Sequence, residues 1–427
     1  MRQVMELILL SVTFGDDCGL LRAGIGPEPS HLVHRHQKEY LRSAHEGCIV
    51  HDSKAADTVR WFQRSTQCPT AWAISCLDHF NCEDVLLDVS DTLRAGLKSL
   101  GLDDIITVRA SQCLELVPDC LERQHLVLNA NLMNASWARL LPPTSILVNM
   151  EQLVSYSLPQ AIVAAHKAAT DPRGDDKVVI TGKRSLKTAL GQLPDQKVIG
   201  VTVDDYRGFS ALNPESTDYP WLEYSYKNAD LAKAAGQPCV YIKPIGVSKL
   251  PVQRNHHFRG EVDFLHVGGV SVSRRRRILS TLEKAGWRAV VADGYFSDAR
   301  DSILQLSTVG LNIHRHQDRR VVEVLRLLMY ASQGMLIISE GGDTRSDSHS
   351  KVDDRLLELE LQAAVMFVPY SRLPQCASVL LQPSARSASA RERLHNNIDK
   401  LVLARQEAKL LAATLHVLFP HCHFVSS

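Results

Sequence analysis

The sequence predicts an α/β fold with parallel sheets, and its C-terminal half predicts a Rossmann-like, doubly wound sheet. Two observations lead to this fold class. Short apolar runs alternate with helical patterns along most of the chain, and glycine follows several of the expected helix ends. Strand–helix–strand repetition indicates a parallel sheet with helices on both faces, because right-handed crossover connections place successive strands in one sheet.

The N-terminal half carries the weaker pattern. Residues 1–45 mix a short apolar run with prolines and histidines, and we treat them as a poorly defined lead-in. Glu83–Val89 predicts a strand, and Ser90 or Asp91 then caps a helix that ends at Gly101. Further strands are expected at Ile105–Val108, His125–Asn129 and Ser145–Asn149.

Residues 157–217 interrupt this alternation. They are rich in Lys, Asp, Gly and Ala and hold two strand-like pieces, Lys177–Thr181 and Lys197–Val203. The segment is either a small inserted subdomain or a mobile flap, and the sequence leaves both interpretations open.

After Gly260 the alternation becomes regular. A long helical pattern, Ala390–Leu418, ends before Pro420. The expected strands are Val262–Val267, Arg288–Ala292, Val309–Ile313 and Met335–Ser339; the expected helices are Arg274–Ala285, one that starts at Asp298 or Asp301, and Arg319–Ser332.

Composition narrows the function classes. The formal net charge of +1 gives no electrostatic case for a nucleic-acid partner. No stretch is long and apolar enough to span a bilayer, and the apolar run Val4–Val12 contains Glu6 and precedes no clear cleavage site, so a secretory signal is not expected. The ten cysteines form no CxxC pair, which predicts reduced, buried thiols in a cytoplasmic protein.

Glycines and arginines follow the first two expected strands of the C-terminal half. Gly268 and Gly269 precede the run Arg274–Arg277, and Arg300 follows the second strand. A glycine loop admits backbone N–H groups to a phosphate, and guanidinium groups bind phosphates through paired hydrogen bonds. We expect Arg274, Arg275 and Arg300 near an anion; a solvated basic surface and an ion pair of Arg300 with Asp298 or Asp301 are the alternatives.

Three more polar groups follow the later strands. His314 stands at the end of the third strand, where a histidine can donate to a phosphate or a sugar hydroxyl. Glu340 and Gly341 end the fourth strand, where the carboxylate can bind a sugar hydroxyl and the glycine permits close backbone approach. A structural histidine and a tight turn are the alternatives.

The helix expected at Arg319–Ser332 carries one polar stripe on an otherwise apolar surface. Arg319, Glu323, Arg326 and Tyr330 lie on it at spacings of three and four residues. A buried Glu323 requires a partner, which is either a neighbouring arginine or the two hydroxyls of a ribose, since a carboxylate accepts through both oxygens.

In their order and spacing, several segments resemble bacterial GT-B-like glycosyltransferases of the "glycosyl transferases group 1" type. The likeness covers about Asp84–Gln382, with a gap. The segments that carry it are Ile146–Gln152, Trp221–Asn228, Pro244–Gly246, Phe264–Gly269 with the arginine run, Gly294–Asp301, Leu311–His314, Val322–Arg326 and Leu336–Glu340.

The resemblance implies two Rossmann-like, doubly wound domains that face a cleft, with an inserted segment. Residues 46–245 would hold the acceptor and residues 246–389 the donor, a nucleotide diphosphate sugar, while residues 390–427 pack back. Glu323 matches the glutamate that binds the donor ribose in such enzymes, and Gly268, Gly269 and the arginines match their diphosphate loop. Such enzymes usually need neither a bound metal nor a permanent cofactor, because protein cations offset the charge of the leaving diphosphate.

The implied activity is transfer of a sugar to a hydroxyl of a glycan, lipid-linked or protein acceptor, in glycan or cell-surface polysaccharide synthesis. An inverting enzyme requires a general base from the N-terminal domain, for which we name Glu151, with Asp78 and His79 as alternatives; His314 is the second catalytic candidate. Peripheral contact with a membrane stays open.

Other interpretations have weaker support in the sequence. A catalytically inactive protein of the same fold could bind a nucleotide sugar or a protein partner. His31, His34 and His36, or His421 and His423, offer metal-ligand types, but neither group has a standard zinc spacing. The sequence contains no GxSxG motif typical of a hydrolase.

Overall fold

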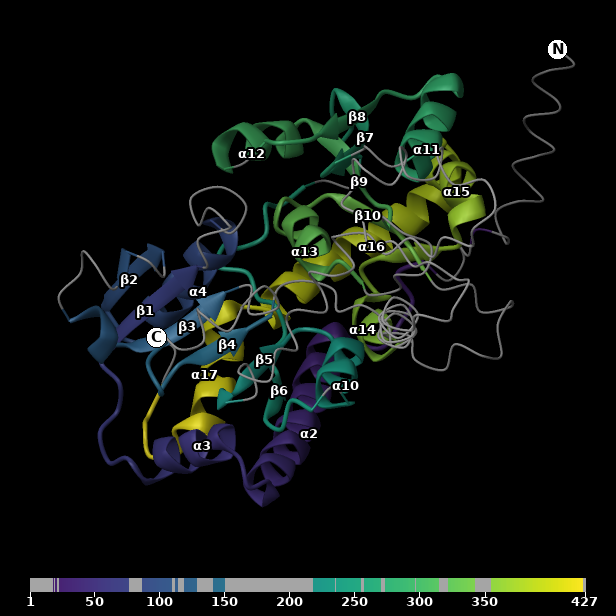
Figure 1. Ribbon diagram of the computed structural model, residues 1–427. Coiled ribbons are helices and arrows are strands. Elements are labelled where there is room, and N and C mark those ends of the chain that lie inside the picture. Colours follow the sequence, from purple (N-terminus) through teal and green to yellow (C-terminus); the bar gives the residue numbers. More distant parts are fainter. Residues whose placement is uncertain are drawn as a thin grey trace, which may run out of the picture.

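Two parallel β-sheets, each flanked by helices, form the frame of the molecule (Figure 1). The computed structural model describes residues 23–76, 87–109, 112–113, 119–128, 141–149, 218–234, 236–254, 257–269, 273–295, 297–314, 322–341 and 355–424, together with Cys18 and Leu20. The predicted fold class, α/β with two Rossmann-like domains, is confirmed. The expected insertion at 157–217 lies outside the described residues.

The N-terminal sheet has the strand order β2-β1-β3-β4-β5-β6, and all its strands are parallel. The order reverses between β1 and β3, which makes this the point at which open α/β sheets bind ligands. The strands are β1 (Ala71–Cys76), β2 (Asp104–Arg109), β3 (Gln124–Leu128), β4 (Ile146–Val148), β5 (Trp221–Glu223) and β6 (Val240–Ile242).

The C-terminal sheet repeats this arrangement with the parallel order β11-β10-β9-β7-β8. Its order reverses between β7 and β9, so the corresponding ligand-binding edge lies at the carboxyl ends of these two strands. The strands are β7 (Val262–Val267), β8 (Ala289–Ala292), β9 (Ser307–Asn312), β10 (Leu336–Glu340) and β11 (Met366–Val368).

Helices cover both sheets. One buried apolar cluster runs from the N-terminal sheet to one face of the C-terminal sheet, where it includes Leu265 and Ile337, and a second cluster lies on the other face of the C-terminal sheet. The helices are α2 (Pro29–Val50), α3 (Lys54–Arg64), α4 (Leu87–Ser99), α10 (Tyr226–Ala234), α11 (Ser273–Lys284), α12 (Ser297–Gln305), α13 (Val324–Ser332), α14 (Arg355–Leu361), α15 (Leu373–Leu381), α16 (Ala385–Ala404) and α17 (Glu407–Leu418), with short 3-10 turns at Cys120–Glu122 and Tyr370–Arg372.

The chain crosses between the two halves twice, and the crossings touch. Val247, on the connection after β6, forms a β-bridge with Gln406, between α16 and α17. The backbone N–H of Val247 donates to the carbonyl of Arg405 at 2.8 Å, and that of Glu407 donates to Val247 at 3.0 Å. The Arg405 side chain is fully buried and pairs with Glu360 of α14 at 2.7 Å. The predicted tail helix is therefore two helices, and α17 packs against α4 of the N-terminal half.

Glycines end several helices as the sequence predicts. Gly101, Gly286 and Gly334 follow α4, α11 and α13 with φ angles of +77°, +88° and +63°. Only glycine adopts this left-handed conformation without steric cost. The strands predicted in the C-terminal half are confirmed to within about two residues, as are the N-terminal strands predicted at Ile105–Val108, His125–Asn129 and Ser145–Asn149.

Two predictions for the N-terminal half are wrong. The strand expected at Glu83–Val89 is contradicted at its end, because α4 already begins at Leu87 and buries Val89, Leu93 and Leu97 at helical spacing. The sequence also failed to predict α2 within the stretch taken as a poorly defined lead-in. Tertiary packing accounts for that helix, since Val33, Leu41 and Ala44 are buried on the face that packs against β6 and α16.

The prediction of reduced thiols is also wrong. Disulfides join Cys18 to Cys376, Cys48 to Cys239, Cys68 to Cys422 and Cys113 to Cys120, and Cys76 is disulfide-bonded too. None of the described cysteines is free. Three of the bridges connect positions 191 or more residues apart, so nothing in the local spacing revealed them.

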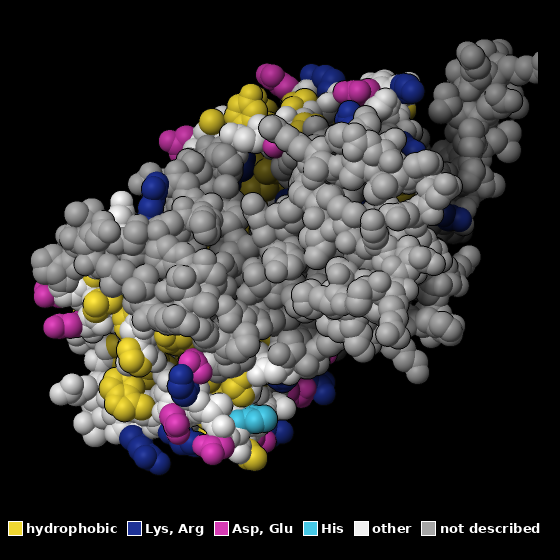
Figure 2. Space-filling model, in the orientation of Figure 1, with side chains coloured by type: hydrophobic (Ala, Val, Ile, Leu, Met, Phe, Trp, Pro, Cys, Tyr) yellow, Lys and Arg dark blue, Asp and Glu magenta, His cyan; other side chains and the backbone are white. Residues whose placement is uncertain are grey.

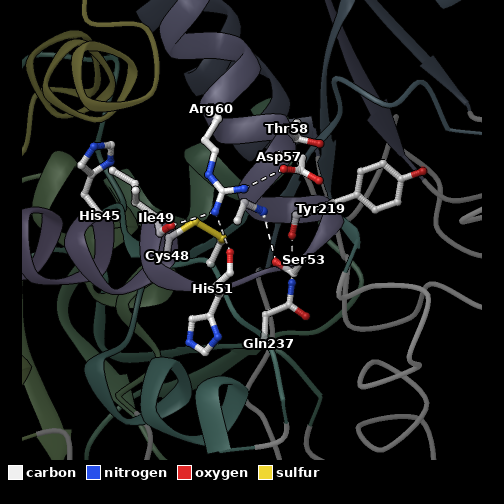
Figure 3. The surroundings of a disulfide bond; sticks show 12 residues. His45, Cys48, Ile49, His51, Ser53, Asp57, Thr58, Arg60, Tyr219 and Gln237 are labelled. Carbon is white, nitrogen blue, oxygen red and sulfur yellow. Dashed lines mark hydrogen bonds and ion pairs between the residues drawn. A yellow bond between two sulfur atoms is a disulfide. The ribbon is translucent and has the colours of Figure 1, made fainter.

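Figure 3 shows how one bridge fastens the end of α2. Cys48 there bonds to Cys239, which precedes β6. Arg60 of α3 donates to the carbonyl oxygens of Ile49 and His51, each at 2.9 Å, and thereby satisfies the carboxyl end of α2. The disulfide and the guanidinium together hold α2 and α3 against the edge of the N-terminal sheet.

Among the helices of the described part of the chain, none has the length and apolar character required to cross a bilayer.

Candidate functional site

Residues from four parts of the C-terminal half meet at the carboxyl ends of β7, β9 and β10, where the strand order reverses. Gly268 follows β7, His314 follows β9, and Glu340 is the last residue of β10. Arg274 and Arg275 open α11, and Glu323 stands directly before α13. Parallel strands end at one edge of their sheet, so side chains that are far apart in sequence become neighbours there.

Gly268 lies between two guanidinium groups. Its φ of +114° is unfavourable for a residue with a side chain, and a Cβ at this position would lie 3.2 Å from Arg326 Nη2 and 4.0 Å from Arg275 Nη1. A glycine here thus leaves room for a ligand beside two cations, as the sequence predicted for a phosphate loop. The second glycine, Gly269, contributes its carbonyl oxygen, which accepts from Arg275 at 2.8 Å.

Glu323 joins those two guanidinium groups. Arg275 Nη2 lies 3.4 Å from its Oε1, and Arg326 forms an ion pair with its Oε2. Arg275 is buried and also donates to the carbonyl of Ile313 at 2.9 Å, while Arg326 donates to Asn312 Oδ1 at 2.7 Å. The sequence placed Glu323 inside a helix, but it is the residue before the first turn of α13. Its carboxylate is 18% exposed, so a ligand can reach it.

Arg274 and Glu340 form a second cluster with His314. The guanidinium and the carboxylate make two hydrogen bonds of 2.6 and 2.5 Å, and Arg274 stacks on the Tyr370 ring at 3.8 Å. Glu340 also accepts from the backbone N–H of His314 at 3.1 Å. Arg274 and Glu340 were predicted to bind a phosphate and a sugar hydroxyl; each is instead engaged by the other here.

His314 is the buried group of this site whose side chain has an unused nitrogen. Its Nδ1 has no hydrogen-bond partner among the described residues, although the residue is only 6% exposed. Burial lowers the pKa of His314, and the nearby carboxylates of Glu323 and Glu340 oppose this shift. A buried nitrogen without a partner costs free energy, which a bound ligand recovers by pairing with it.

The buried histidines predict a loss of stability in mild acid. Burial lowers the pKa of His125, His266 and His314 below the ordinary 6.5. The unfolded chain therefore takes up protons before the folded chain does, so stability is complete above pH 6.5 and falls as the pH drops toward the folded pKa values. Calorimetry should show a lower Tm at about pH 5.5 than at about pH 7.5.

The His266→Gln variant should show a smaller decrease over the same pH range, because glutamine does not titrate. A variant that repeats the full wild-type decrease would show that His266 makes no contribution. His36 acts in the opposite sense, since its hydrogen bond to Glu360 raises its pKa.

A cavity of about 390 Å³ lies between the two halves and reaches Gly268 and Arg326. Its C-terminal wall includes the apolar side chains Leu325, Leu328 and Met329 of α13. Its N-terminal wall comes from α4 and from the carboxyl ends of β4, β5 and β6. The carboxyl end of β7 and those of β4, β5 and β6 thus face a common space.

Glu223, at the end of β5, organises the N-terminal wall. Its carboxylate accepts from Asn149 Nδ2 at 2.6 Å, Asn228 Nδ2 at 3.2 Å, Trp221 Nε1 at 3.3 Å and the backbone N–H of Tyr224 at 2.9 Å. Burial raises the pKa of Glu223 to about 8, against the effect of these donors. These four donors hold the Glu223 side chain in place, so Glu223 orders this wall of the cavity.

Two predicted site residues have other contacts. Arg300 lines the same cavity as Gly268, but its guanidinium pairs with Asp88 of α4 and with Asp301; the pair with Asp301 was one of the alternatives. Gly341 packs against Phe367, whose Cβ would lie 2.9 Å from an added Cβ, so its small size serves sheet packing. Glu151, the expected base, lies outside the described residues, as do Asp78 and His79.

Two other groups of the site were not among the predicted ligands. Arg326 was considered only as an ion-pair partner of Glu323, yet it lines the cavity beside Gly268. Asn312, on β9, holds the guanidinium of Arg326. The polar stripe of the predicted helix already contained Arg326, whereas no sequence signal marked Asn312, which sits in a buried strand.

One candidate metal-ligating histidine near the N-terminus, His36, and a group of two cysteines and a histidine in the sheet are engaged otherwise. His36 Nδ1 lies 3.2 Å from Glu360 Oε1, and its helix packs on β6. Cys113, Cys120 and His125 lie close together, but the two cysteines form a disulfide. His125 bonds Ser75 Oγ through Nδ1 and the carbonyl of Cys120 through Nε2, which leaves no ring nitrogen for a metal.

Comparison with known proteins finds little close similarity. No protein-family model matches the chain. The uncharacterized protein L138 of Acanthamoeba polyphaga mimivirus is 28% identical over 159 residues, which make up 36% of this chain and 16% of that protein. The matched stretch thus spans about a sixth of the length of this curated relative.

Several solved structures of glycosyltransferases superpose on most of the chain. T4 phage BGT in complex with UDP and Mn²⁺ matches at 11% identity and a TM-score of 0.45, over 82% of this chain and 99% of that one. A glycosyltransferase of Rickettsia africae matches at 7% identity and a TM-score of 0.36, over 82% and 98%. The calicheamicin glycosyltransferase CalG4 matches at 11% identity and a TM-score of 0.31, over 81% and 98%. These scores are low, and the fold described above rests on the chain's own strand order.

Proposed function

We propose that this chain is a glycosyltransferase that moves a sugar from a nucleotide diphosphate sugar to a hydroxyl acceptor bound in the cleft. One observation carries the proposal. Gly268, with a positive φ, lies beside the guanidinium groups of Arg275 and Arg326, which share the carboxylate of Glu323. The Nδ1 of His314 has no hydrogen-bond partner among the described residues. Cations for a diphosphate and a carboxylate for a ribose diol meet at the edge where such sheets bind nucleotides.

The guanidinium groups of the site fit a diphosphate. Arg274, Arg275 and Arg326 gather at the strand ends, where the carboxylates of Glu323, Glu340 and Asp293 offset their charge until an anion binds. In glycosyl transfer the leaving diphosphate gains negative charge as its bond to the sugar breaks, and fixed guanidinium groups stabilise that charge. For this reason we propose that the reaction requires no metal ion. Glu151 remains our proposed base.

The acceptor is proposed to be a glycan, a lipid-linked sugar or a protein, and the pathway to be glycan or cell-surface polysaccharide synthesis. A nucleic-acid acceptor is disfavoured by charge. In the described part of the face drawn in Figure 2, basic and acidic side chains are interspersed and form no continuous basic track. Contact with a membrane surface stays open.

A compartment that permits disulfides suits this chain better than the cytoplasm. The expectation of a cytoplasmic protein rested on reduced thiols, and every described cysteine is disulfide-bonded instead. Structural disulfides persist in oxidising compartments and are rare in the cytosol. We therefore propose that the protein folds in such a compartment.

A thermal-shift screen tests the function. We expect UDP or GDP, and one of their sugar conjugates, to raise the Tm, since a ligand at a hundred times its Kd stabilises the native state by about 2.7 kcal/mol. The shift should persist in EDTA if no metal is required, and a shift seen only with added Mn²⁺ would contradict that part of the proposal. No shift with any nucleotide would remove the donor site. Slow hydrolysis of the bound donor separates an enzyme from an inactive binding protein.

A further inference from the structure

Asp88 and Arg300 form an ion pair across the rim of the cleft. Asp88 lies in the first turn of α4, which packs on the N-terminal sheet, and Arg300 lies in α12 of the C-terminal half. The guanidinium approaches the carboxylate with two nitrogens: Nη2 donates to Oδ1 at 2.9 Å, and Nη1 donates to Oδ2. Paired bonds of this kind fix the orientation of the two groups as well as their separation.

The pair belongs to a row of four alternating charges. Arg300 Nη2 also donates to Asp301 Oδ1 at 3.2 Å, and Asp301 Oδ2 accepts from Lys249 Nζ at 3.1 Å. Lys249 lies on the first connection between the two halves, two residues after the bridge at Val247. All four residues line the cavity. The row therefore ties both walls of the cleft to the connecting segment.

Burial distinguishes this contact from an ordinary surface ion pair. An exposed pair contributes at most about 1 kcal/mol, because water and salt screen it. The side chain of Arg300 is only 9% exposed, whereas that of Asp88 is 50% exposed. Burial alone would lower the pKa of Arg300, yet Asp88 and Asp301 raise it. Withdrawal of Asp88 would leave a shielded cation with one carboxylate instead of two.

We propose that Asp88 and Arg300 are positioning residues, whose ion pair holds the two walls of the cleft at the separation at which donor and acceptor meet. The role in catalysis rests on the proposed glycosyl transfer, but the effect on the separation of the walls does not. Arg300 acts on the opposite wall and makes no contact with the donor diphosphate. The ion pair of Arg405 with Glu360 lies beside the crossings, so it fixes the closed side of the cleft, whereas Asp88 and Arg300 lie at its rim.

Charge reversal and its rescue test the inference. Asp88→Arg and Arg300→Asp each place like charges at the rim, and the double variant restores an opposite pair. In small-angle scattering we expect each single variant to show a larger radius of gyration than the wild type, and the double variant to return to the wild-type value. Asp103→Arg makes the same charge change on an exposed residue beyond the end of α4, outside the cavity, and should leave the radius unchanged.

Donor hydrolysis and UDP affinity provide a second measurement. With UDP-glucose as the probe donor, hydrolysis should fall about tenfold or more in each single variant and recover in the double variant, while UDP affinity stays within about twofold throughout. Equal radii in all variants would overturn the inference. Loss of UDP binding in Arg300→Asp alone, with Asp88→Arg unaffected, would also overturn it and make Arg300 a donor ligand. A wild type that hydrolyses no donor would count against the proposed function, while the scattering result would still decide the role of the pair.

Discussion

The Glu323→Ala variant is expected to bind UDP or GDP roughly 10 to 150 times more weakly than the wild type, with its fold intact. A hydrogen bond to a charged group contributes about 1.5–3 kcal/mol, and the ribose loses its carboxylate partner. The substitution lies before the first turn of α13, where Glu323 makes no side-chain cap, so the helix does not depend on it. Isothermal titration calorimetry measures the affinity, and circular dichroism checks the fold.

Pyrophosphate binding tests the arginines of this site separately from the carboxylate proposed to bind the ribose. Without Glu323, the guanidinium groups of Arg275 and Arg326 lose their carboxylate and attract an anion more strongly. Pyrophosphate should therefore bind the variant at least as well as it binds the wild type, while the nucleotide binds less well. Glu283→Ala, on the exposed face of α11, is the matched control and should change neither affinity. Parallel losses of both ligands would show that Glu323 only orders the arginines, and unchanged UDP affinity would remove the ribose role.

Reduction of the disulfides is expected to unfold the protein at physiological temperature. Loss of one native disulfide typically costs 2–5 kcal/mol, whereas the whole stability of a native protein is about 5–15 kcal/mol. At that cost, the four described bridges together contribute about 8–20 kcal/mol, which equals or exceeds the stability of a typical protein. Differential scanning calorimetry with and without a reductant measures the effect, and mass spectrometry under non-reducing conditions should find no free thiol.

Two double variants test whether the stability that a disulfide contributes depends on the length of the loop it closes. Cys48→Ser with Cys239→Ser opens a loop with a sequence separation of 191, and Cys113→Ser with Cys120→Ser opens one with a separation of 7. Because a longer closed loop restricts the unfolded chain more, the first pair should lower the Tm further than the second. If reduction leaves the Tm unchanged, the thiols are not paired in solution and the case for an oxidising compartment fails.

Four of the five strands of the C-terminal sheet, β7 to β10, were predictable because their local signals agree. Apolar strands, glycines after helices and polar residues after strands all point to one arrangement, as with Val262–Val267 followed by Gly268. In the N-terminal half β1 (Ala71–Cys76) was missed, since its sequence AWAISC has no alternation and is buried almost throughout. Helix α2 was missed because its buried positions emerge only when it packs against β6 and α16.

The sequence predicted that the residues of the site would meet at the strand ends, but it did not predict which side chains would form ion pairs with each other. Gly268, Arg275 and Glu323 converge because they follow or precede elements that end at one edge of the sheet. Arg300 also follows a strand of that sheet, yet its carboxylate partner, Asp88, is 212 residues away in the other half. The local sequence pattern determines at which edge of the sheet a side chain lies. Which ion pairs form depends on how the two halves are placed relative to each other.

The paired crossings at Val247 and Gln406 have a mechanical consequence. Two connections bonded side by side leave the halves less free to rotate relative to each other than a single connection would. Helix α17 packs on α4 of the N-terminal half, and Cys422 is tied to Cys68, so the second connection is anchored beyond the bridge. The crossings therefore restrict relative motion of the halves, and the distance between Asp88 and Arg300 would follow any change in their separation.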